Sequence, residues 1–345
     1  MTYDTDQPRG SIDFHTHFTP AELMPERSSG EFLTARTNGV PSYTFHPQLC
    51  DLERMLVEKR DGGVALSVVS SAVGYAAPLD VCKRLNDRLA TVQAEHGDEV
   101  LCMAHVNPFH GAASVAELDR ARGLGLRGLA VSSDIDEMPL DDSRIFDIYE
   151  ALTARGDFLF VHPSVCPRGM SHLDRHDMAR SIGREFGLVE AIVRLVDGGI
   201  FDRFSRLQVV VSHLGGGLAA FLARILAFQD RGFWGLEGDP RHGTRPERPF
   251  AEYLESNLLF DTAGSSGDVR SLDIATRWLP TSRIVFGTDY PQELRTGAAI
   301  RQFTADIQRV VGDDVSSAIH GRNALKLLQA AEGSPIVLSD FGVSI

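Results

Sequence analysis

The sequence predicts an α/β fold, a distorted (β/α)8 TIM barrel that forms a single domain over residues 1–345. Eight short apolar runs recur along the chain, and helical patterns lie between most of them, as in a parallel sheet. Polar residues suited to metal or proton chemistry end the first, fifth, sixth and eighth runs. A first and an eighth strand usually lie far apart in an open sheet, so this placement favours a closed barrel. Length alone would also fit two domains.

The eight apolar runs are interpreted as buried strands because they are short and rich in aliphatic and aromatic residues. They are 11–15, 64–70, 101–105, 128–131, 158–162, 208–213, 258–261 and 284–289. Helical periodicity is expected between them, for example over 79–96, 112–124, 144–155, 217–229 and 269–278. The tail 313–332 is predicted to form a closing helical pair, with the apolar stripe of 323–328 packed on the barrel.

Two stretches interrupt this alternation and are predicted to be loop insertions. Residues 18–47 follow the first strand and are rich in Pro, Ser, Thr and Gly, as expected of a long loop that folds over the catalytic face. Residues 232–249 form the second insertion. Long loops at this face usually form lids or subunit contacts, although a surface excursion without such a role stays open.

Composition excludes several classes of partner. The chain has 34 Lys and Arg against 47 Asp and Glu, a net charge of −13, which disfavours nucleic acid and anionic membranes. No segment offers the roughly 18 uninterrupted apolar residues of a membrane span, and the polar, acidic first residues do not resemble a signal peptide. The four cysteines are scattered without a Cys-x-x-Cys pair. We therefore expect a soluble protein in a reducing cytoplasm.

Four residues at three strand ends are candidate metal ligands: His15, His17, His162 and Asp289. Residues i and i+2 of a strand point to the same side, so His15 and His17 can present two imidazoles to one ion. Neutral imidazoles and a carboxylate suit Zn2+ or Mn2+, and such a site leaves a position open for water or substrate. A single strand-end histidine is often only a packing residue, but four such coincidences favour a site.

His213 ends the sixth run in Val-Val-Val-Ser-His-Leu-Gly-Gly-Gly and is the candidate general acid or base. It could instead be a further ligand, because imidazole does both jobs. The three glycines after it could start a helix whose amides meet a substrate anion, although a tight turn explains them better. The fourth run, 128–131, contains no lysine to bridge two metals, which favours a single ion.

The order of four motifs resembles that of the amidohydrolase superfamily: His-x-His at 15–17, His-Pro at 162–163, His-x-Gly-Gly-Gly at 213–217 and Gly-Thr-Asp-Tyr-Pro at 287–291. More narrowly, the chain is similar to the metal-dependent decarboxylases typified by aminocarboxymuconate-semialdehyde decarboxylase. The likeness runs over nearly the whole chain. As a set, the motifs are specific for the superfamily and less specific for the reaction.

The resemblance implies that His15, His17, His162 and Asp289 bind one divalent metal, Zn2+ in the first place, and that His213 is the acid or base beside it. It also implies a homodimer in which an arginine crosses the interface to the partner's substrate.

Three further features concern the substrate contacts that the resemblance implies. Arg231 lies within one residue of the place expected for the crossing arginine. His46 stands where the typifying decarboxylase has a carboxylate-binding arginine. The glutamate that resorcylate-type decarboxylases have three residues beyond the sixth-strand histidine is missing, because the chain reads His213-Leu-Gly-Gly there. The histidine at position 46 weakens the case for the substrate of the typifying decarboxylase, and the missing glutamate weakens the case for a phenolic acid.

The leading hypothesis is a mononuclear metal-dependent carbon–carbon lyase, a non-oxidative decarboxylase of a small unsaturated or aromatic carboxylic acid. In it, His213 and Asp289 manage protons while the cation stabilises the developing anion. A hydrolase of a lactone, amide or other acyl bond, or a hydratase, would use the same residues. A third hypothesis, a barrel that binds a ligand without turnover, predicts an incomplete metal site.

Overall fold

The computed structural model describes residues 10–24, 32–37, 40–164, 169, 171–229, 232, 235, 238 and 246–330. Its parallel strands form a three-stranded and a six-stranded sheet, which lie side by side around one axis. The first sheet has the order β1 (Ser11–His17), β4 (Val64–Ser70), β5 (Val100–Cys102). The second has the order β13 (Ile284–Val285), β12 (Leu258–Asp261), β11 (Gln208–Val211), β10 (Phe158–His162), β7 (Leu129–Ser132), β6 (Ala104–His105).

Backbone hydrogen bonds join the two sheets into a closed barrel. On one side, β5 and β6 are separated by Met103 alone, whose amide donates to the Val69 carbonyl of β4 at 2.9 Å. On the other side, β1 meets the segment after β13, with Phe14 N donating to Phe286 O at 2.8 Å and His17 N to Tyr290 O at 2.7 Å. The predicted barrel is therefore confirmed, with β5 and β6 sharing one of its eight positions.

Alternate strand residues divide into an inner and an outer apolar cluster, as the two-residue period of a strand requires. The inner cluster fills the barrel and comprises Ile12, Phe14, Leu66, Val68, Leu101, Met103, Ala130, Phe158, Phe160, Val210, Leu259 and Val285 among others. Residues of the opposite parity, such as Val161, Val211 and Phe260, pack outwards against the helices. This filled interior is a packed core, so chemistry is confined to the ends of the strands.

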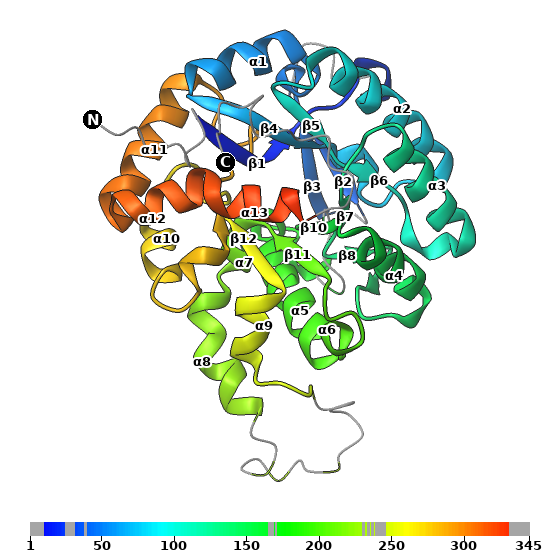
Figure 1. Cartoon of the computed structure of the whole chain (residues 1–345), viewed down its shortest axis with the longest axis vertical. Helices are drawn as coiled ribbons and strands as arrows, with labels where there is room; N and C mark the ends of the chain where they lie inside the picture. Colours follow the sequence, from blue (N-terminus) through cyan, green and yellow to red (C-terminus); the bar gives the residue numbers. More distant parts are fainter. Residues whose placement is uncertain are drawn as a thin grey trace.

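Helices surround the strands (Figure 1). They are α1 (Leu52–Asp61), α2 (Leu79–His96), α3 (Ala112–Gly123), α4 (Phe146–Arg155), α5 (Arg184–Asp197), α6 (Ile200–Arg203), α8 (Leu218–Gln229), α9 (Phe250–Ser256), α10 (Arg270–Ala275), α11 (Gly297–Val311), α12 (Asp313–Ser317) and α13 (Asn323–Gln329). The apolar residues of α13, among them Leu325 and Leu328, join the inner cluster and close one end of the barrel, as the sequence predicts for 323–328.

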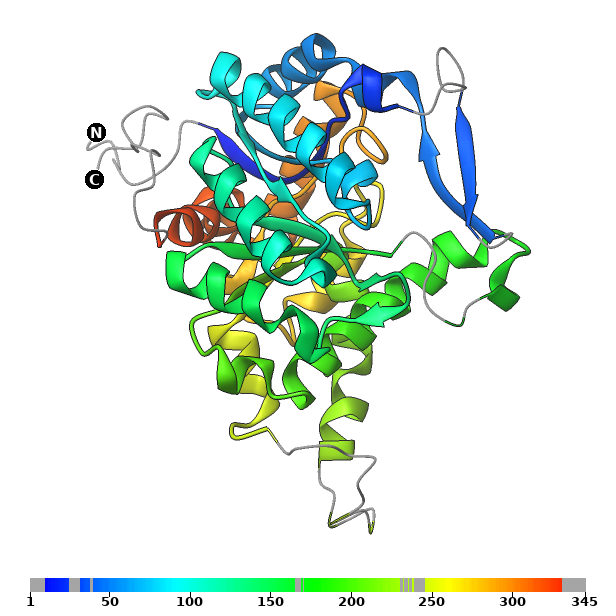
Figure 2. The same cartoon turned by 90° about the vertical axis from the view of Figure 1, so that its right-hand side faces the viewer.

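The insertion at residues 18–47 is only partly a loop. It contains an antiparallel hairpin, β2 (Leu33–Thr37) and β3 (Val40–Phe45), which the expectation of a long loop missed. Figure 2 shows this hairpin at the side of the barrel away from α13, with the segment that leads into α5 at its end. Tyr43 and Phe45 pack on Leu49 in a small apolar cluster, which anchors the hairpin. Most of the second insertion, 232–249, lies outside the described residues.

Two predicted strands end early because the chain turns into the site. The run 208–213 is a strand only to Val211, and the run 284–289 only to Val285. Residues 213–217 all have positive φ and form the left-handed turn α7 (His213–Gly216), so the glycines make a tight turn, as the sequence favours. Asp289 also has positive φ, +47°. Such strain in residues other than glycine is typical of functional positions.

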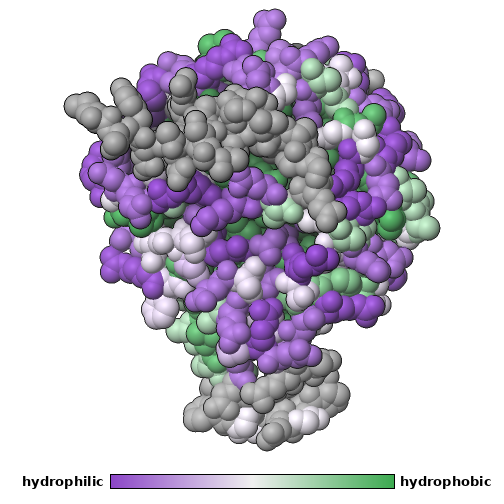
Figure 3. Space-filling model, viewed as in Figure 1, coloured by the Kyte–Doolittle hydropathy of each residue, from purple (hydrophilic) through white to green (hydrophobic). Residues whose placement is uncertain are grey.

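The described part of the surface in Figure 3 is mainly hydrophilic, with apolar residues in small groups. Isolated apolar residues of this kind are normal on a protein surface. Among the described helices, none combines the length and the apolar character needed to cross a membrane.

Candidate metal centre and active site

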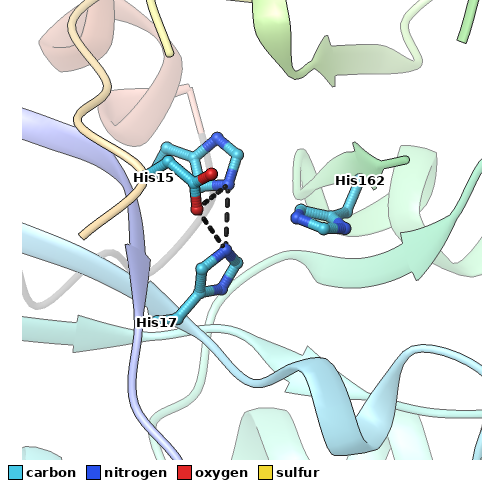
Figure 4. Close-up of side chains that lie close together, drawn as sticks. His15, His17 and His162 are labelled. Atoms are coloured by element: carbon cyan, nitrogen blue, oxygen red, sulfur yellow. Dashed lines mark hydrogen bonds and ion pairs between the residues drawn. The ribbon is translucent and has the colours of Figure 1, made fainter. Parts of the chain in front are cut away.

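The strand ends bring His15, His17, His162 and Asp289 together inside the barrel mouth. One possible ligand atom from each residue lies within 4.8 Å of the others, and all four side chains are buried. His15 Nε2 is 3.1 Å from His17 Nε2, and Asp289 Oδ1 is 3.5 Å and 2.9 Å from these two nitrogens. Figure 4 shows His15 and His17 on one strand with His162 facing them from another. We call these four residues the metal cluster.

The geometry of β1 explains how two histidines reach the same point. Ile12 and Phe14 point into the barrel, and the register with β4 shifts between Asp13 and Thr16. The irregularity changes which residues face inwards, so His15 and His17 both face the centre. On β10 the period is regular, and His162 continues the inward face of Phe158 and Phe160.

Each imidazole of the metal cluster is oriented by a partner on its other nitrogen. His15 Nδ1 lies 2.8 Å from Asp261 Oδ2, at the end of β12. His162 Nδ1 lies 3.0 Å from the carbonyl oxygen of Pro163. His17 Nδ1 lies 3.2 Å from the hydroxyl of Tyr75. When Nδ1–H donates to these oxygens, the lone pairs of all three Nε2 atoms are available to a metal.

These protonation states give a test of whether a metal fits. Two Nε2 lone pairs at 3.1 Å repel each other unless a proton or a cation lies between them. Metal–ligand bonds of roughly 2.0–2.2 Å place neighbouring ligand atoms about 3.0–3.5 Å apart, which agrees with the spacings between His15, His17 and Asp289. The residues present therefore suit one divalent cation of the Zn2+ or Mn2+ type.

The local charges keep His17, His162 and Asp289 in the form that a metal requires, whereas they favour a protonated His15, whose proton a bound cation would replace. Burial lowers the pKa of His17, with Asp289 opposing it only in part, and burial with the neighbouring imidazoles lowers the pKa of His162 further. Both rings are thus neutral, as metal binding requires. Burial also disfavours a charged His15, but Asp261 and Asp289 outweigh it and raise its pKa. Burial disfavours an ionised Asp289, yet the imidazoles of His15 and His17 lower its pKa.

Beneath the metal cluster, a buried network of ionic contacts and hydrogen bonds connects β1 with the segment after β13, the two segments that close the barrel. Asp13 Oδ1 accepts from His15 N at 3.0 Å and from Thr288 N at 3.1 Å. Asp13 Oδ2 accepts from Thr288 Oγ1 at 2.6 Å and forms an ion pair with Lys59 of α1. His15 is a candidate ligand, and Thr288 adjoins the candidate ligand Asp289 on the other side of the closure. The contacts of Asp13 with both residues therefore hold His15 and Asp289 near each other.

His213 lies beside the metal cluster and outside it. Its ring stacks on His15, with 5.4 Å between centroids, and its Nε2 is 3.8 Å from Asp289 Oδ2 and has no hydrogen-bond partner. Its Nδ1 is 2.9 Å from Glu185 Oε1 of α5. Burial opposes protonation, but the carboxylates of Glu185, Asp289 and Glu293 raise the pKa of His213 to about 10. The unpartnered Nε2 therefore lies towards the cluster, and the role of His213 as an acid or base, or as a further ligand, stays a prediction.

Two glycines allow the His213 turn to approach its neighbours. A Cβ on Gly216 would lie 2.1 Å from the Glu185 carbonyl oxygen, and a Cβ on Gly264 would lie 2.5 Å from the His213 ring. Both glycines have positive φ, so larger residues would be strained there as well as too close. The alternative of a helix start with free amides is not found at 215–217, because the turn is left-handed and α8 begins only at Leu218.

A cavity of about 480 Å³ opens above the metal cluster. Its lining includes His162, His213 and Asp289 from the strand ends, and the rest comes from the hairpin, from the segment before α5 and the first turn of α5, and from residues 264–293. Those other lining residues are Tyr43, Thr44, Asp177, Arg180, Ser181, Arg184, Glu185, Gly264, Ser266, Gln292 and Glu293. A second cavity of about 260 Å³ lies on the other side of His213 and Glu185. The volume of the larger cavity suits a small molecule.

The two predicted substrate contacts differ in outcome. His46 is buried with its ring stacked on Phe32, 5.0 Å between centroids, and it is not among the residues that line the 480 Å³ cavity. Both of its ring nitrogens lack a hydrogen-bond partner, and burial lowers its pKa to about 4. Arg231 lies outside the described residues. Both roles therefore stay predictions.

Sequence reasoning missed Asp261, Glu185 and Arg184. Asp261 ends a predicted strand, and the rule that identified Asp289 would have found it. Glu185 and Arg184 lie in the first turn of α5, where nothing in the sequence marks them. A carboxylate does reach His213, but from α5 and not from three residues beyond it.

Known proteins resemble this chain in both sequence and structure. Residues 12–330 match the protein family described as Amidohydrolase. The chain is 26% identical to the 2-amino-3-carboxymuconate-6-semialdehyde decarboxylase of Dictyostelium discoideum over 268 residues, which cover 76% of this chain and 71% of that protein. It is 28% identical to decarboxylase orsB of Emericella nidulans over 280 residues, 77% of this chain and 81% of that protein.

Among solved structures, the fold is similar to that of 5-carboxyvanillate decarboxylase LigW from Sphingomonas paucimobilis. The TM-score is 0.76 at 21% sequence identity, and the match covers 93% of this chain and 99% of that one. At this identity the likeness concerns the fold, and the chemistry must be argued from the site itself.

Proposed function

We propose that this chain, which belongs to the amidohydrolase family, is a metal-dependent non-oxidative decarboxylase of a small aromatic or unsaturated carboxylic acid. The observation that carries the proposal is the pairing of a one-metal cluster with a separate, carboxylate-supported histidine at the base of a cavity. The names of the two relatives support the same reaction class, since both are decarboxylases.

In this proposal His15, His17, His162 and Asp289 hold one divalent cation, Zn2+ in the first place with Mn2+ as the alternative. When bound, the cation attracts the oxygens of the substrate and stabilises the negative charge that develops as carbon dioxide leaves. Asp261 orients His15 through its 2.8 Å contact, so the ligand set is rigid before the substrate arrives.

His213 supplies the proton that the reaction consumes. The bond between the substrate carbon and its carboxylate breaks, the electron pair stays on that carbon, and the proton on His213 Nε2 forms the new carbon–hydrogen bond. Glu185 stabilises the imidazolium and fixes Nδ1–H, which leaves Nε2 as the donor towards the cavity. Asp289 faces His213 at 3.8 Å and keeps the transferable proton near the cluster.

Carbon dioxide release from the metal-loaded protein tests this proposal. We expect release from members of a panel of unsaturated and aromatic carboxylic acids, lost after chelation and restored by Zn2+ or Mn2+. Hydrolysis of lactones or amides without gas would contradict the decarboxylase and favour a hydrolase with the same residues. Full metal content without turnover on any compound would favour a binding protein.

Three predictions from the sequence are proposals about the whole protein: a single domain over 1–345, a homodimer in which Arg231 reaches the partner's substrate, and a cytoplasmic location. Light scattering on the purified chain measures the mass in solution. If the chain is a dimer, mixing an Arg231→Ala chain with an inactive His213→Ala chain should restore part of the activity. A monomer of full activity would contradict the dimer proposal.

A further inference from the structure

Two arginines line the cavity, Arg180 and Arg184, and among the described residues only Arg180 has an ion-pair partner. Arg180 forms a two-pronged ion pair with Asp177, at 2.7 Å and 2.6 Å, and also donates to Thr44. Arg184, one helical turn later, makes no hydrogen bond or ion pair to any described residue, and its Nε is buried without a partner. Arg184 is half-buried, and a buried Nε without a partner in a polar cavity indicates a place for a ligand that accepts its hydrogen bond.

Arg184 is close to the reacting end of the cavity. Its positive charge helps to lower the pKa of His162 and acts against the burial that raises the pKa of Tyr43. It shares the lining with His162, His213 and Asp289. A molecule that reaches the metal cluster therefore also meets the guanidinium.

The acidic groups of the cavity are already engaged. Asp177 is held by Arg180, and Glu185 by His213. Glu293 Oε2 accepts from the amides of Gly264 at 2.9 Å and Ser266 at 3.0 Å. Among the described residues, none of these carboxylates lies within ion-pair distance of Arg184. Asp177 is near enough for Arg184 to help lower its pKa, but both of its oxygens are held by Arg180, so a direct partner for Arg184 is left to a ligand.

We propose that Arg184 binds a second carboxylate of the substrate, so that the preferred substrates carry two acidic groups. One is the carboxylate that leaves at the metal cluster, and the other pairs with the planar guanidinium through two hydrogen bonds. This inference rests on the proposed function for the identity of the leaving group, and it makes Arg184 the residue that selects among acids.

Ligand pairs that differ only in the second charge provide the test. Calorimetric titration of the metal-loaded protein would compare isophthalate and terephthalate with 3- and 4-carbamoylbenzoate, in which a neutral amide replaces one carboxylate. We expect the better diacid to bind the wild type about tenfold or more tightly than its amide. In Arg184→Gln, binding of this diacid should weaken by about 10- to 100-fold and that of the amide by less than about threefold.

Two further variants separate the role of Arg184 from general damage. Arg184→Lys keeps the charge but not the planar fork, and it should recover part of the selectivity. Arg224→Gln removes an exposed arginine of α8 outside the cavity lining and should change neither affinity. Metal content and thermal unfolding should match the wild type in all three variants, which excludes misfolding as the cause.

The inference is overturned if the wild type does not prefer a diacid, or if Arg184→Gln weakens diacid and amide equally. These binding results do not depend on turnover. If diacid selectivity disappears in Arg184→Gln but no acid releases carbon dioxide, the proposed decarboxylase activity is contradicted and the proposed Arg184 site is supported. If carbon dioxide is released but the KM for diacids is unchanged by Arg184→Gln, the decarboxylase activity is supported and the Arg184 site is contradicted.

Discussion

The metal cluster and the cavity wall above it, formed by Tyr43, Arg180, Arg184 and Glu185, are built by different means. The cluster lies on strand ends, and oriented partners hold its three imidazoles, as Asp261 does for His15. The wall comes from the β2–β3 hairpin and the start of α5, and it includes a guanidinium without a partner. A closed barrel can position the first set alone, whereas the second depends on insertions that meet above it.

We infer from this difference that one part of the site governs the chemistry and another part governs the choice of substrate. In the proposed reaction, the metal held by the cluster would supply charge stabilisation and His213 would supply a proton, which many acids could use. We expect the wall to select which acid reaches them, because its charged side chains line the cavity above the cluster. We therefore expect changes in the cluster to abolish chemistry and changes in the wall to alter rates or preferences.

Removing a ligand should have the largest effect. His162→Ala is expected to lose the metal and to lower turnover by about 10³-fold or more, because electrostatic stabilisation at the reacting atoms disappears. Metal content per chain and carbon dioxide release measure both. His110→Ala, which replaces an exposed histidine, is the matched control. Near-normal metal content in His162→Ala would remove His162 from the ligand set.

Breaking the buried network beneath the cluster should act on stability. Lys59 and Asp13 are 3% and 0% exposed, so Lys59→Met leaves an uncompensated buried carboxylate and should lower the free energy of unfolding by about 3–5 kcal/mol. Denaturant unfolding of the metal-free protein measures this. Arg277→Met breaks the exposed pair with Asp273 and should change it by about 0.5 kcal/mol at most. Equal effects would show that the network is not structural.

Removing the partner of His213 should have the smallest effect of the three. Glu185→Gln keeps the shape of the side chain but not its charge, and kcat should fall by about 10- to 100-fold with metal content unchanged. Glu190→Gln, on the exposed side of the same helix, is the control. A fall in metal content together with kcat would mean that Glu185 supports the cluster and not the proton donor.

The strand-end residues could be predicted from sequence because a strand has a fixed period and a barrel has one reactive face. His15, His17, His162 and Asp289 each follow an apolar run, and closure of the barrel brings these runs together. The bounds of 64–70, 158–162 and 258–261 are those of β4, β10 and β12. The early ends of β11 and β13 could not be predicted, because tertiary contacts impose the positive φ of His213 and Asp289.

The wall could not be predicted from sequence because no periodicity connects its parts. Thr44 and Arg180 meet across 136 positions, and their contact depends on how the hairpin and the segment before α5 fold over the barrel mouth. The hairpin, in contrast, is marked in the sequence: Leu33-Thr34-Ala35-Arg36 alternates apolar and polar residues, and the dipeptide Asn38-Gly39 that follows is typical of a two-residue hairpin turn. The expected contact of His46 with substrate stays a prediction; its ring stacks on Phe32 and is not part of the lining of the 480 Å³ cavity.

Anomalous X-ray diffraction from crystals of the metal-loaded protein tests the central claim most directly. The account predicts one peak per chain at the absorption edge of the bound metal, about 2.0–2.2 Å from the Nε2 atoms of His15, His17 and His162 and from a carboxylate oxygen of Asp289. Two peaks at the barrel mouth, or a single peak bound by other residues while these four side chains make no contact with it, would contradict it.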